Sequence, residues 1–336
     1  MKLRSMEAGR GLAALLVALS HSSDTVKDNP ALHAGPVLGG IHFPGGPGVE
    51  FFFVLSGFVM MLGHHNDFGQ ARRIPVFLWR RFCRIYPLFW VVMLALLWQF
   101  WGVPQLRWGR IGGMLSLLPG SLDNLLIVAW SLRQEISFYI MLALAMLPWV
   151  GRPILAAWVA AVLTVNFGWV VVAMGPFPAA FVSAFSIEFF AGLLCGWLLL
   201  HWRPSPRTAA ILFAASVAAL VWRLSLDNWG VEYGPTLARA IYGACYGGVI
   251  LSLAQLERAG ALRLGAWAGV AGAASYPLYL SHPVTVAWIA DWTAANAPHV
   301  IGGNALVAAM LAASVLVALV LSYGVDRPLQ RLLRRA

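Results

Sequence analysis

The chain has 336 residues, of which 60% are hydrophobic and 11% are charged, and its formal net charge at pH 7 is +10. Soluble globular domains carry about 25% charged residues, so this composition excludes a soluble fold and predicts a polytopic membrane protein. A basic balance also occurs in nucleic-acid-binding proteins, but in a membrane protein it reflects Lys and Arg kept in cytoplasmic loops. We therefore expect no nucleic-acid partner. The three cysteines stand at no metal-ligand spacing and predict neither disulfides nor a zinc site.

The apolar segments predict an all-α integral membrane protein. A spanning helix needs about 20 mainly apolar residues, and no segment is long and polar enough to form a separate soluble domain. We therefore expect one transmembrane domain over residues 1–336. The ten predicted spans are residues 5–22, 47–63, 86–102, 131–149, 153–174, 179–200, 208–225, 236–255, 269–290 and 302–323.

The distribution of arginines orients these spans. If the N-terminus is cytoplasmic, the even-numbered connections and the tail after residue 324 face the cytoplasm and carry most of the arginines. The outward connections hold mainly Lys27, Arg107 and Arg110. This asymmetry follows the positive-inside rule. It predicts cytoplasmic N- and C-termini and a multi-pass location in the inner (plasma) membrane.

Arg10 and His21 flank the first apolar stretch, with no charged residue between them. In a helix, eleven steps make three turns plus about 20° and rise roughly 16 Å, so both side chains share one face at different depths. A charge near the bilayer centre costs about 3 kcal/mol on insertion scales, which favours a protein interior or a polar cavity for both. A cleaved signal peptide is the alternative, but Arg10 stands where its apolar run should begin.

Two long outward connections separate the early spans. Residues 23–46 are rich in Gly and Pro, and residues 103–130 include an apolar patch at 111–118. That patch is too short to span, so we expect it to lie in the interface or to re-enter the membrane. Four histidines outside the spans could suggest a metal, but the predicted topology divides them between the two sides, so we expect solvated loop histidines and no metal. They are His33, His42, His64 and His65.

Residues 74–85 form an amphipathic pattern. Arg80, Arg81 and Arg84 fall within about 100° on a helical wheel, opposite apolar side chains. The pattern predicts a helix on the cytoplasmic interface that ends where Tyr86 and Pro87 open the next span. It has two interpretations. The arginines either anchor lipid headgroups or form an anionic-ligand site, since guanidinium groups bind phosphate through paired donors.

Four further ionisable residues lie inside apolar segments: Glu50, Glu135, Glu188 and His282. Each alone can be a structural ion pair or an interhelical hydrogen bond. Together with the arginine–histidine pair of the first span, they are typical of a buried acid/base site. A proton relay in a transporter would use the same residues, so the residues alone leave both interpretations open.

Seven motifs follow one another along the chain. Through these motifs and their order, the sequence resembles the acyltransferase-3 family of integral-membrane O-acyltransferases over nearly its whole length. The motifs are Arg10-x10-His21, residues 48–58 (GVEFFFVLSGF), residues 81–87 (RFCRIYP), Trp130-Ser131-Leu132 with Glu135 and Phe138-Tyr139, Glu188-Phe189 with Gly192, Ser275-Tyr276 with Tyr279-Leu280 and His282, and Asp326-Arg327-Pro328.

The resemblance implies transfer of an acyl group, commonly acetyl, from cytoplasmic acyl-CoA to a hydroxyl of a saccharide or other small acceptor. Acyl-CoA is then a substrate, and we expect no permanently bound cofactor. His21 is expected to act as base or acyl carrier, because activating a hydroxyl needs a base. Glu50 or Glu135 is expected to orient it. Arg10 is expected to hold an anionic part of the donor or a carboxylate.

The remaining candidates follow from the same resemblance. We expect Arg81 and Arg84, assisted by Arg80, to bind the donor phosphates. Direct transfer and an acyl-histidine relay remain open. Further candidate site residues are Glu188, His282, Trp130, Ser131 and Tyr139.

Three departures from the family pattern accompany this prediction. Glu50 stands where the family more often has Asp, which keeps the charge. Ser186 and Ile187 stand where an arginine often precedes the Glu188 motif, so the sequence does not supply the usual partner of Glu188. Some relatives carry an additional esterase-like domain, which we do not expect here.

Two other classes of function are alternatives to the enzyme. A transporter or exporter of a small anionic or lipid-linked solute would use the buried charges as a relay. A non-catalytic membrane scaffold would leave those charges unexplained. The sequence leaves open the acceptor, the acyl chain and the oligomeric state.

Overall fold

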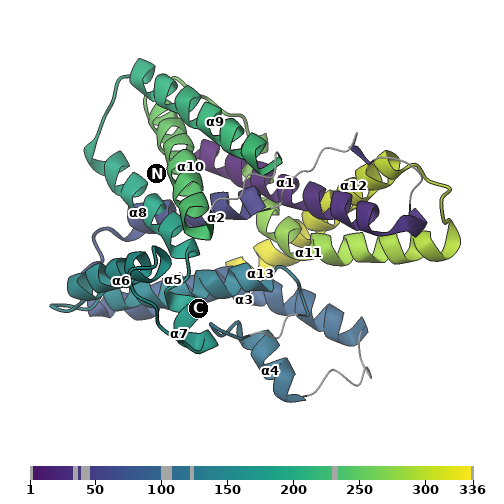
Figure 1. Ribbon diagram of the computed structural model, residues 1–336, viewed down its shortest axis with the longest axis horizontal. Helices are drawn as coiled ribbons and strands as arrows, with labels where there is room; N and C mark the ends of the chain where they lie inside the picture. The colour runs from purple at the N-terminus through teal and green to yellow at the C-terminus, as the bar shows by residue number, and fades with distance from the viewer. Residues whose placement is uncertain are drawn as a thin grey trace.

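The computed structural model describes residues 3–32, 37–38, 46–99, 108–121, 125–228 and 234–333. Every regular element in these ranges is helical (Figure 1), which confirms the all-α prediction for this part of the chain. His33 and His42 lie outside the described residues. The α-helices are α1 (Arg4–Asp28), α2 (Gly46–His64), α3 (Ile74–Gln99), α4 (Trp108–Ser116), α5 (Ala129–Ala145), α6 (Gly151–Asn166), α7 (Pro176–Phe181), α8 (Phe185–His201), α9 (Pro206–Asn228), α10 (Pro235–Arg258), α11 (Trp267–Asn296), α12 (Gly303–Leu321) and α13 (Arg327–Leu333).

Each predicted span overlaps one of the longer helices. Of the short helices, α7 overlaps the start of the predicted span 179–200, whereas α4 and α13 are additional. The described residues contain 5 helical stretches long and apolar enough to cross a membrane. The long helices α1 and α11 are not among them, and both carry polar residues of the candidate site described below. The chain is therefore a multi-pass membrane protein, while ten spans and cytoplasmic termini stay predictions. The stretches are Ala71–Trp98, Pro176–His201, Pro206–Leu226, Thr236–Arg258 and Gly303–Leu333.

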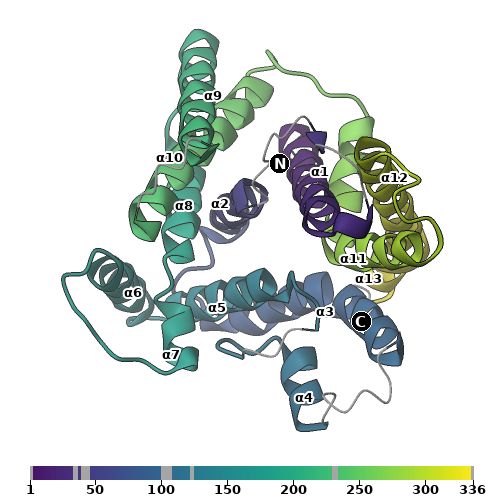
Figure 2. The same cartoon turned by 45° about the vertical axis from the view of Figure 1, so that its right-hand side comes forward.

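The helices surround one interior region. α2 lies between α1 and α8, and α10 packs against both α8 and α9. On the other side, α1 packs along α11, which in turn contacts α12. α3 and α5 lie side by side across one side of this bundle (Figures 1 and 2). Helices α1, α2 and α11 therefore meet α3 and α5 at the region that holds the candidate site.

Two glycines of the sequence motifs explain how closely α2 and α8 approach. A Cβ atom added at Gly57 would lie 2.1 Å from the backbone oxygen of Phe189. One added at Gly192 would lie 1.9 Å from the backbone oxygen of Val54. No larger residue fits at either position without moving a helix. Small residues of this kind allow close helix packing in membranes, where apolar surface alone gives little drive for association.

The predicted break at Tyr86 and Pro87 is wrong. α3 is one continuous helix from Ile74 to Gln99, with Pro87 inside it. Membrane helices tolerate an interior proline when neighbouring groups satisfy the local backbone. Near this proline, the Tyr276 hydroxyl of α11 donates a hydrogen bond to the Ile85 carbonyl at 2.6 Å, which ties the two helices together.

The apolar patch at 111–118 forms the end of α4 and the turn after it. The Tyr86 hydroxyl donates to the Ser116 carbonyl at 2.7 Å, and Trp90 Nε1 donates to the Leu115 carbonyl at 2.9 Å. Both donors lie near the middle of α3, and Leu117 is fully buried. This packing holds the patch against α3, and its place in the membrane stays a prediction.

Candidate active site

A cavity of about 130 Å³ lies where α1, α2, α3, α5 and α11 meet. It brings three arginines, Arg10, Arg81 and Arg84, next to a single carboxylate, that of Glu135. The excess of positive charge suits an anionic ligand. We call this region the arginine cavity. Its other polar lining residues are Ser56, Ser131, Tyr139, Ser275, Tyr276 and Tyr279.

Arg10 enters the arginine cavity from α1. Within the described part of the chain, its side chain makes no hydrogen bond or ion pair with the protein. A guanidinium carries five N–H donors in a planar fork. Those of Arg10 are therefore available to a ligand.

Arg81 and Arg84 enter from α3, one helical turn apart. Arg81 Nη2 lies 3.4 Å from His64 Nε2, and its Cζ lies 5.7 Å from the ring centroid of Tyr139. Arg84 Nη1 lies 3.8 Å from an Asp326 carboxylate oxygen, and its Cζ lies 5.1 Å from the Tyr276 ring centroid. Each guanidinium is thus held by a polar partner outside the cavity and by the aromatic face of a tyrosine that lines it.

Arg80 does not join them. It is exposed and is not among the residues that line the arginine cavity. Successive residues of a helix point about 100° apart. The spacing of Arg81 and Arg84 places both toward the cavity and turns Arg80 toward the outside, which corrects its expected role.

Glu135 belongs to the arginine cavity and not to His21. Its Oε1 accepts hydrogen bonds from the Tyr139 hydroxyl and, at 3.3 Å, from the Ser56 hydroxyl. Both Ser56 and Tyr139 also line the cavity. Glu135 therefore joins Ser56 and Tyr139 in the polar lining of the cavity.

Glu50 lies in a separate cluster, with a partner that the sequence analysis missed. Arg239 Nη1 of α10 lies 2.6 Å from Glu50 Oε1 and 3.3 Å from Glu188 Oε1. Arg239 thereby supplies the partner of Glu188 that the preceding residues do not. The sequence feature that indicates Arg239 is its position as an arginine inside the apolar segment 236–255. We call Glu50, Glu188 and Arg239 the carboxylate cluster.

His21 pairs with His282 of α11. His21 Nδ1 lies 2.8 Å from His282 Nε2, and the two rings stack with centroids 5.0 Å apart. His282 is fully buried, and its Nδ1 lies 2.9 Å from the Leu278 carbonyl oxygen. We call His21 and His282 the histidine pair. The expectation that Glu50 or Glu135 orients His21 is wrong, because the hydrogen-bonding partner is a second histidine.

The hydrogen bonds of the histidine pair assign its protons. A carbonyl oxygen only accepts, so His282 Nδ1 carries its hydrogen and His282 Nε2 is an acceptor. His21 Nδ1 must then donate to His282 Nε2. A neutral His21 with its hydrogen on Nδ1 keeps a lone pair on Nε2, which is the form a general base requires.

Tyr279 separates the arginine cavity from the histidine pair. Its hydroxyl lies 2.6 Å from Ser131 Oγ, and its ring lines the cavity. On the other side, the ring centroid of Tyr279 lies 6.1 Å from that of His282. The two regions are therefore neighbours that share one aromatic wall.

The other candidates divide between the cavity and the surrounding core. Ser131 and Tyr139 line the arginine cavity, whereas Trp130 packs against Phe185 with ring centroids 4.9 Å apart. His64 was expected to be a solvated loop histidine, which is wrong: it is only 6% exposed and pairs with Asp67. In the part of the chain that the structure describes, no group of three or more His, Cys, Asp or Glu could hold a metal ion.

Comparison with known proteins adds two findings. Residues 3–323 match the acyltransferase-3 family model, which describes an acyltransferase domain. The chain is 28% identical over 315 residues to the exopolysaccharide production protein ExoZ of Rhizobium meliloti (strain 1021), which covers 87% of this chain and 92% of that relative. No solved structure matches the chain significantly.

Proposed function

Because the chain belongs to the acyltransferase-3 family and is a membrane-bound acyltransferase, we propose that it moves an acyl group, commonly acetyl, from cytoplasmic acyl-CoA to a hydroxyl of a saccharide. The observation that carries this proposal is the arginine cavity lying directly beside the histidine pair, with Tyr279 between them. The first region suits an anionic donor, and the second suits activation of a hydroxyl.

The arginine cavity supports coenzyme A as the donor carrier. Its 3′-phosphate and pyrophosphate make its head strongly anionic, and guanidinium groups bind phosphates through paired donors. Arg10, Arg81 and Arg84 line the same cavity. The pantetheine arm then joins the phosphates to the thioester, which can extend past Tyr279 toward His21.

The histidine pair supports the chemical step. His21 Nε2 removes the proton from the acceptor hydroxyl as its oxygen attacks the thioester carbonyl carbon. The new C–O bond forms, the C–S bond breaks, and the departing thiolate takes the proton from the His21 imidazolium. During transfer, His21 Nδ1–H remains bound to neutral His282 Nε2, which stabilises the transient positive charge. In an acyl-histidine relay, the same Nε2 would attack the thioester first.

The nature of the acceptor follows from the relative. The printed name of ExoZ assigns it to exopolysaccharide production, which supports a saccharide hydroxyl on the acceptor of this chain. The ten-span topology with cytoplasmic termini belongs to the same proposal, because the arginine asymmetry would place α3 and its arginines on the side where acyl-CoA is made.

The proposal is tested with the purified full chain in detergent, where no membrane gradient exists. We expect release of free coenzyme A thiol from acetyl-CoA, accelerated by a saccharide acceptor. Mass spectrometry of surface glycans from cells with and without the protein should show a loss of about 42 Da per acetylated sugar when the protein is absent. Failure to consume acetyl-CoA with any cell-derived acceptor would favour a transporter.

A further inference from the structure

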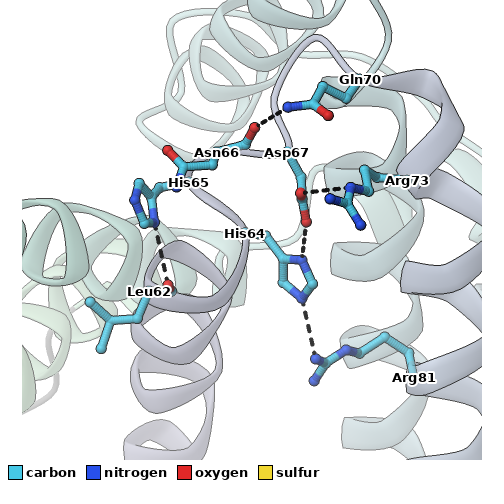
Figure 3. Close-up of polar contacts among 8 residues, drawn as sticks. All are labelled: Leu62, His64, His65, Asn66, Asp67, Gln70, Arg73 and Arg81. Atoms are coloured by element: carbon cyan, nitrogen blue, oxygen red, sulfur yellow. Dashed lines mark hydrogen bonds and ion pairs between the residues drawn. The ribbon is translucent and has the colours of Figure 1, made fainter. Parts of the chain in front are cut away.

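The connection between α2 and α3 forms a polar chain that ends on Arg81 (Figure 3). Arg73 Nε lies 3.6 Å from Asp67 Oδ1, and Asp67 Oδ2 lies 2.8 Å from His64 Nδ1. On the other side of its ring, His64 Nε2 lies 3.4 Å from Arg81 Nη2. His64 closes α2 and is only 6% exposed. A buried histidine thus connects a carboxylate in the loop to an arginine of the cavity.

The chemistry of the two partners fixes the protonation of His64. A carboxylate only accepts hydrogen bonds, so His64 Nδ1 must donate to Asp67. A guanidinium only donates, so His64 Nε2 must accept from Arg81. Only the neutral ring with its hydrogen on Nδ1 satisfies both contacts. A second proton, on Nε2, would place two N–H groups against each other and a positive charge beside a positive charge.

Aromatic packing limits the alternatives open to both side chains. The Phe77 ring meets the His64 ring edge to face, with centroids 4.9 Å apart. The same Phe77 ring lies 5.7 Å from Arg81 Cζ. Phe77 is itself fully buried. His64 and Arg81 are therefore packed around one rigid ring, and their contact is part of a fixed arrangement.

The neighbouring histidine provides an internal comparison. His65 is exposed, and its Nδ1 faces the Leu62 carbonyl at 3.3 Å. In Figure 3 it points away from Arg81. Two adjacent residues of the same type thus differ in burial, partner and direction, which makes His65 a matched control.

We propose that His64 and Asp67 are positioning residues of the donor site, which hold Arg81 against the cavity wall and release it when His64 is protonated. The proposal deepens the function proposed above and rests on it. With one Nη group held by His64, the Arg81 side chain lines the arginine cavity, where the donor phosphates would bind. The affinity for coenzyme A should therefore fall as the pH falls through the titration of His64.

The charges around His64 agree with this direction. Burial lowers the pKa of His64 most strongly; Asp67, from the loop, raises this pKa, while Arg81 and Arg80, from α3, lower it further. Arg73 lies behind Asp67 and reduces the influence of that carboxylate. Bound phosphates would reduce the repulsion between protonated His64 and Arg81. The pH dependence is therefore measured at low donor concentration, where it appears in the affinity for coenzyme A and in the KM.

The test is calorimetric titration of the purified full chain with coenzyme A at pH 8 and pH 6, together with steady-state kinetics. We expect His64→Ala to weaken binding several-fold at pH 8 and to raise the KM for acetyl-CoA while kcat is retained. His64→Gln keeps an acceptor oxygen for Arg81 and does not titrate, so it should keep most of the affinity at pH 8. His65→Gln should behave like the wild type at both pH values.

The pH dependence separates a positioning role from a structural one. A phosphate monoester itself titrates near pH 6, so His64→Gln supplies the baseline that belongs to the ligand. Because burial lowers the pKa of His64, we expect the wild type to lose more affinity than His64→Gln does between pH 8 and pH 6, and several-fold more when the titration is extended to pH 5. Asp67→Asn should also weaken binding at pH 8, because it removes the carboxylate that fixes the His64 hydrogen on Nδ1.

Two failures remain distinguishable. If the wild type binds coenzyme A, Arg81→Ala weakens that binding, and both His64 variants match the wild type at both pH values, this inference is overturned and the proposed function stands. If the wild type neither binds coenzyme A nor consumes acetyl-CoA, the proposed function is overturned and this inference with it.

Discussion

The arginine cavity and the histidine pair both take a residue from α1, yet they differ in what they leave free. In the cavity, Arg81 and Arg84 are each held by a polar partner outside it, and both side chains line open space. In the histidine pair, the hydrogen bonds lie inside the protein, and only His21 Nε2 is left unused. The first region therefore suits the binding of an anion, and the second leaves a single nitrogen lone pair available.

This division predicts how variants should separate. An interaction made equally with bound substrate and transition state changes KM, whereas one made only in the transition state changes kcat. Changes in the arginine cavity should therefore act on donor binding, and changes in the histidine pair on turnover. The carboxylate cluster, which lies in neither region, should act on stability.

The largest effect is expected from His21→Ala. It removes the nitrogen that we propose activates the hydroxyl, and positioned general bases contribute about 10²–10⁴-fold to rate. The rate of transfer from acetyl-CoA, measured as thiol release by the purified protein, should fall by at least about 10²-fold. His201→Ala changes an exposed histidine at the end of α8 and should leave the rate unchanged. Near-normal turnover of well-folded His21→Ala would contradict the proposed chemistry.

Arg239→Ala should lower stability, with no selective effect on donor binding. It would leave two buried carboxylates, Glu50 and Glu188, beside each other without their shared cation. Breaking a buried ion pair from one side costs about 3–5 kcal/mol. We expect a lower midpoint in thermal unfolding of the detergent-solubilised protein, with partial rescue in Arg239→Lys. A stable Arg239→Ala protein that has lost turnover would contradict this and indicate that the carboxylate cluster takes part in catalysis.

His282→Ala should reduce turnover less than the loss of His21 itself. It removes the acceptor that orients His21 Nδ1 and stabilises the imidazolium, and a hydrogen bond to a charged group contributes about 1.5–3 kcal/mol. This corresponds to roughly 10–100-fold in kcat. The KM for acetyl-CoA should stay within about twofold, because His282 is not among the residues that line the arginine cavity. A larger change in KM than in kcat would argue against the division of roles.

The helices and most of the buried polar residues can be predicted from the sequence, because each charged residue inside an apolar segment is recognisable by itself. The sequence was insufficient for their partners. Glu135 and Glu50 were both plausible neighbours of His21, and the packing of α1 along α11 instead brings His282 to it. Such choices depend on long-range helix contacts, which a pattern within one segment does not encode.

Two other differences have local causes. Arg239 was overlooked because the segment around it is long and apolar enough to count as an ordinary span. His64 follows the predicted span 47–63 and is therefore expected in a solvated connection, whereas the Phe77 ring of α3 packs against it. Helix ends at a membrane surface can be buried by the next helix, and composition does not reveal this.

The central claim is that donor binding and chemistry reside in separate neighbouring regions, and calorimetric titration with coenzyme A tests it most directly. Arg81→Lys/Arg84→Lys keeps both charges but loses the planar paired donors that match a phosphate, so its affinity should fall several-fold with unchanged expression. His21→Ala should bind coenzyme A as the wild type does. Unaltered affinity in the double lysine variant, or a comparable loss in His21→Ala, would contradict the account.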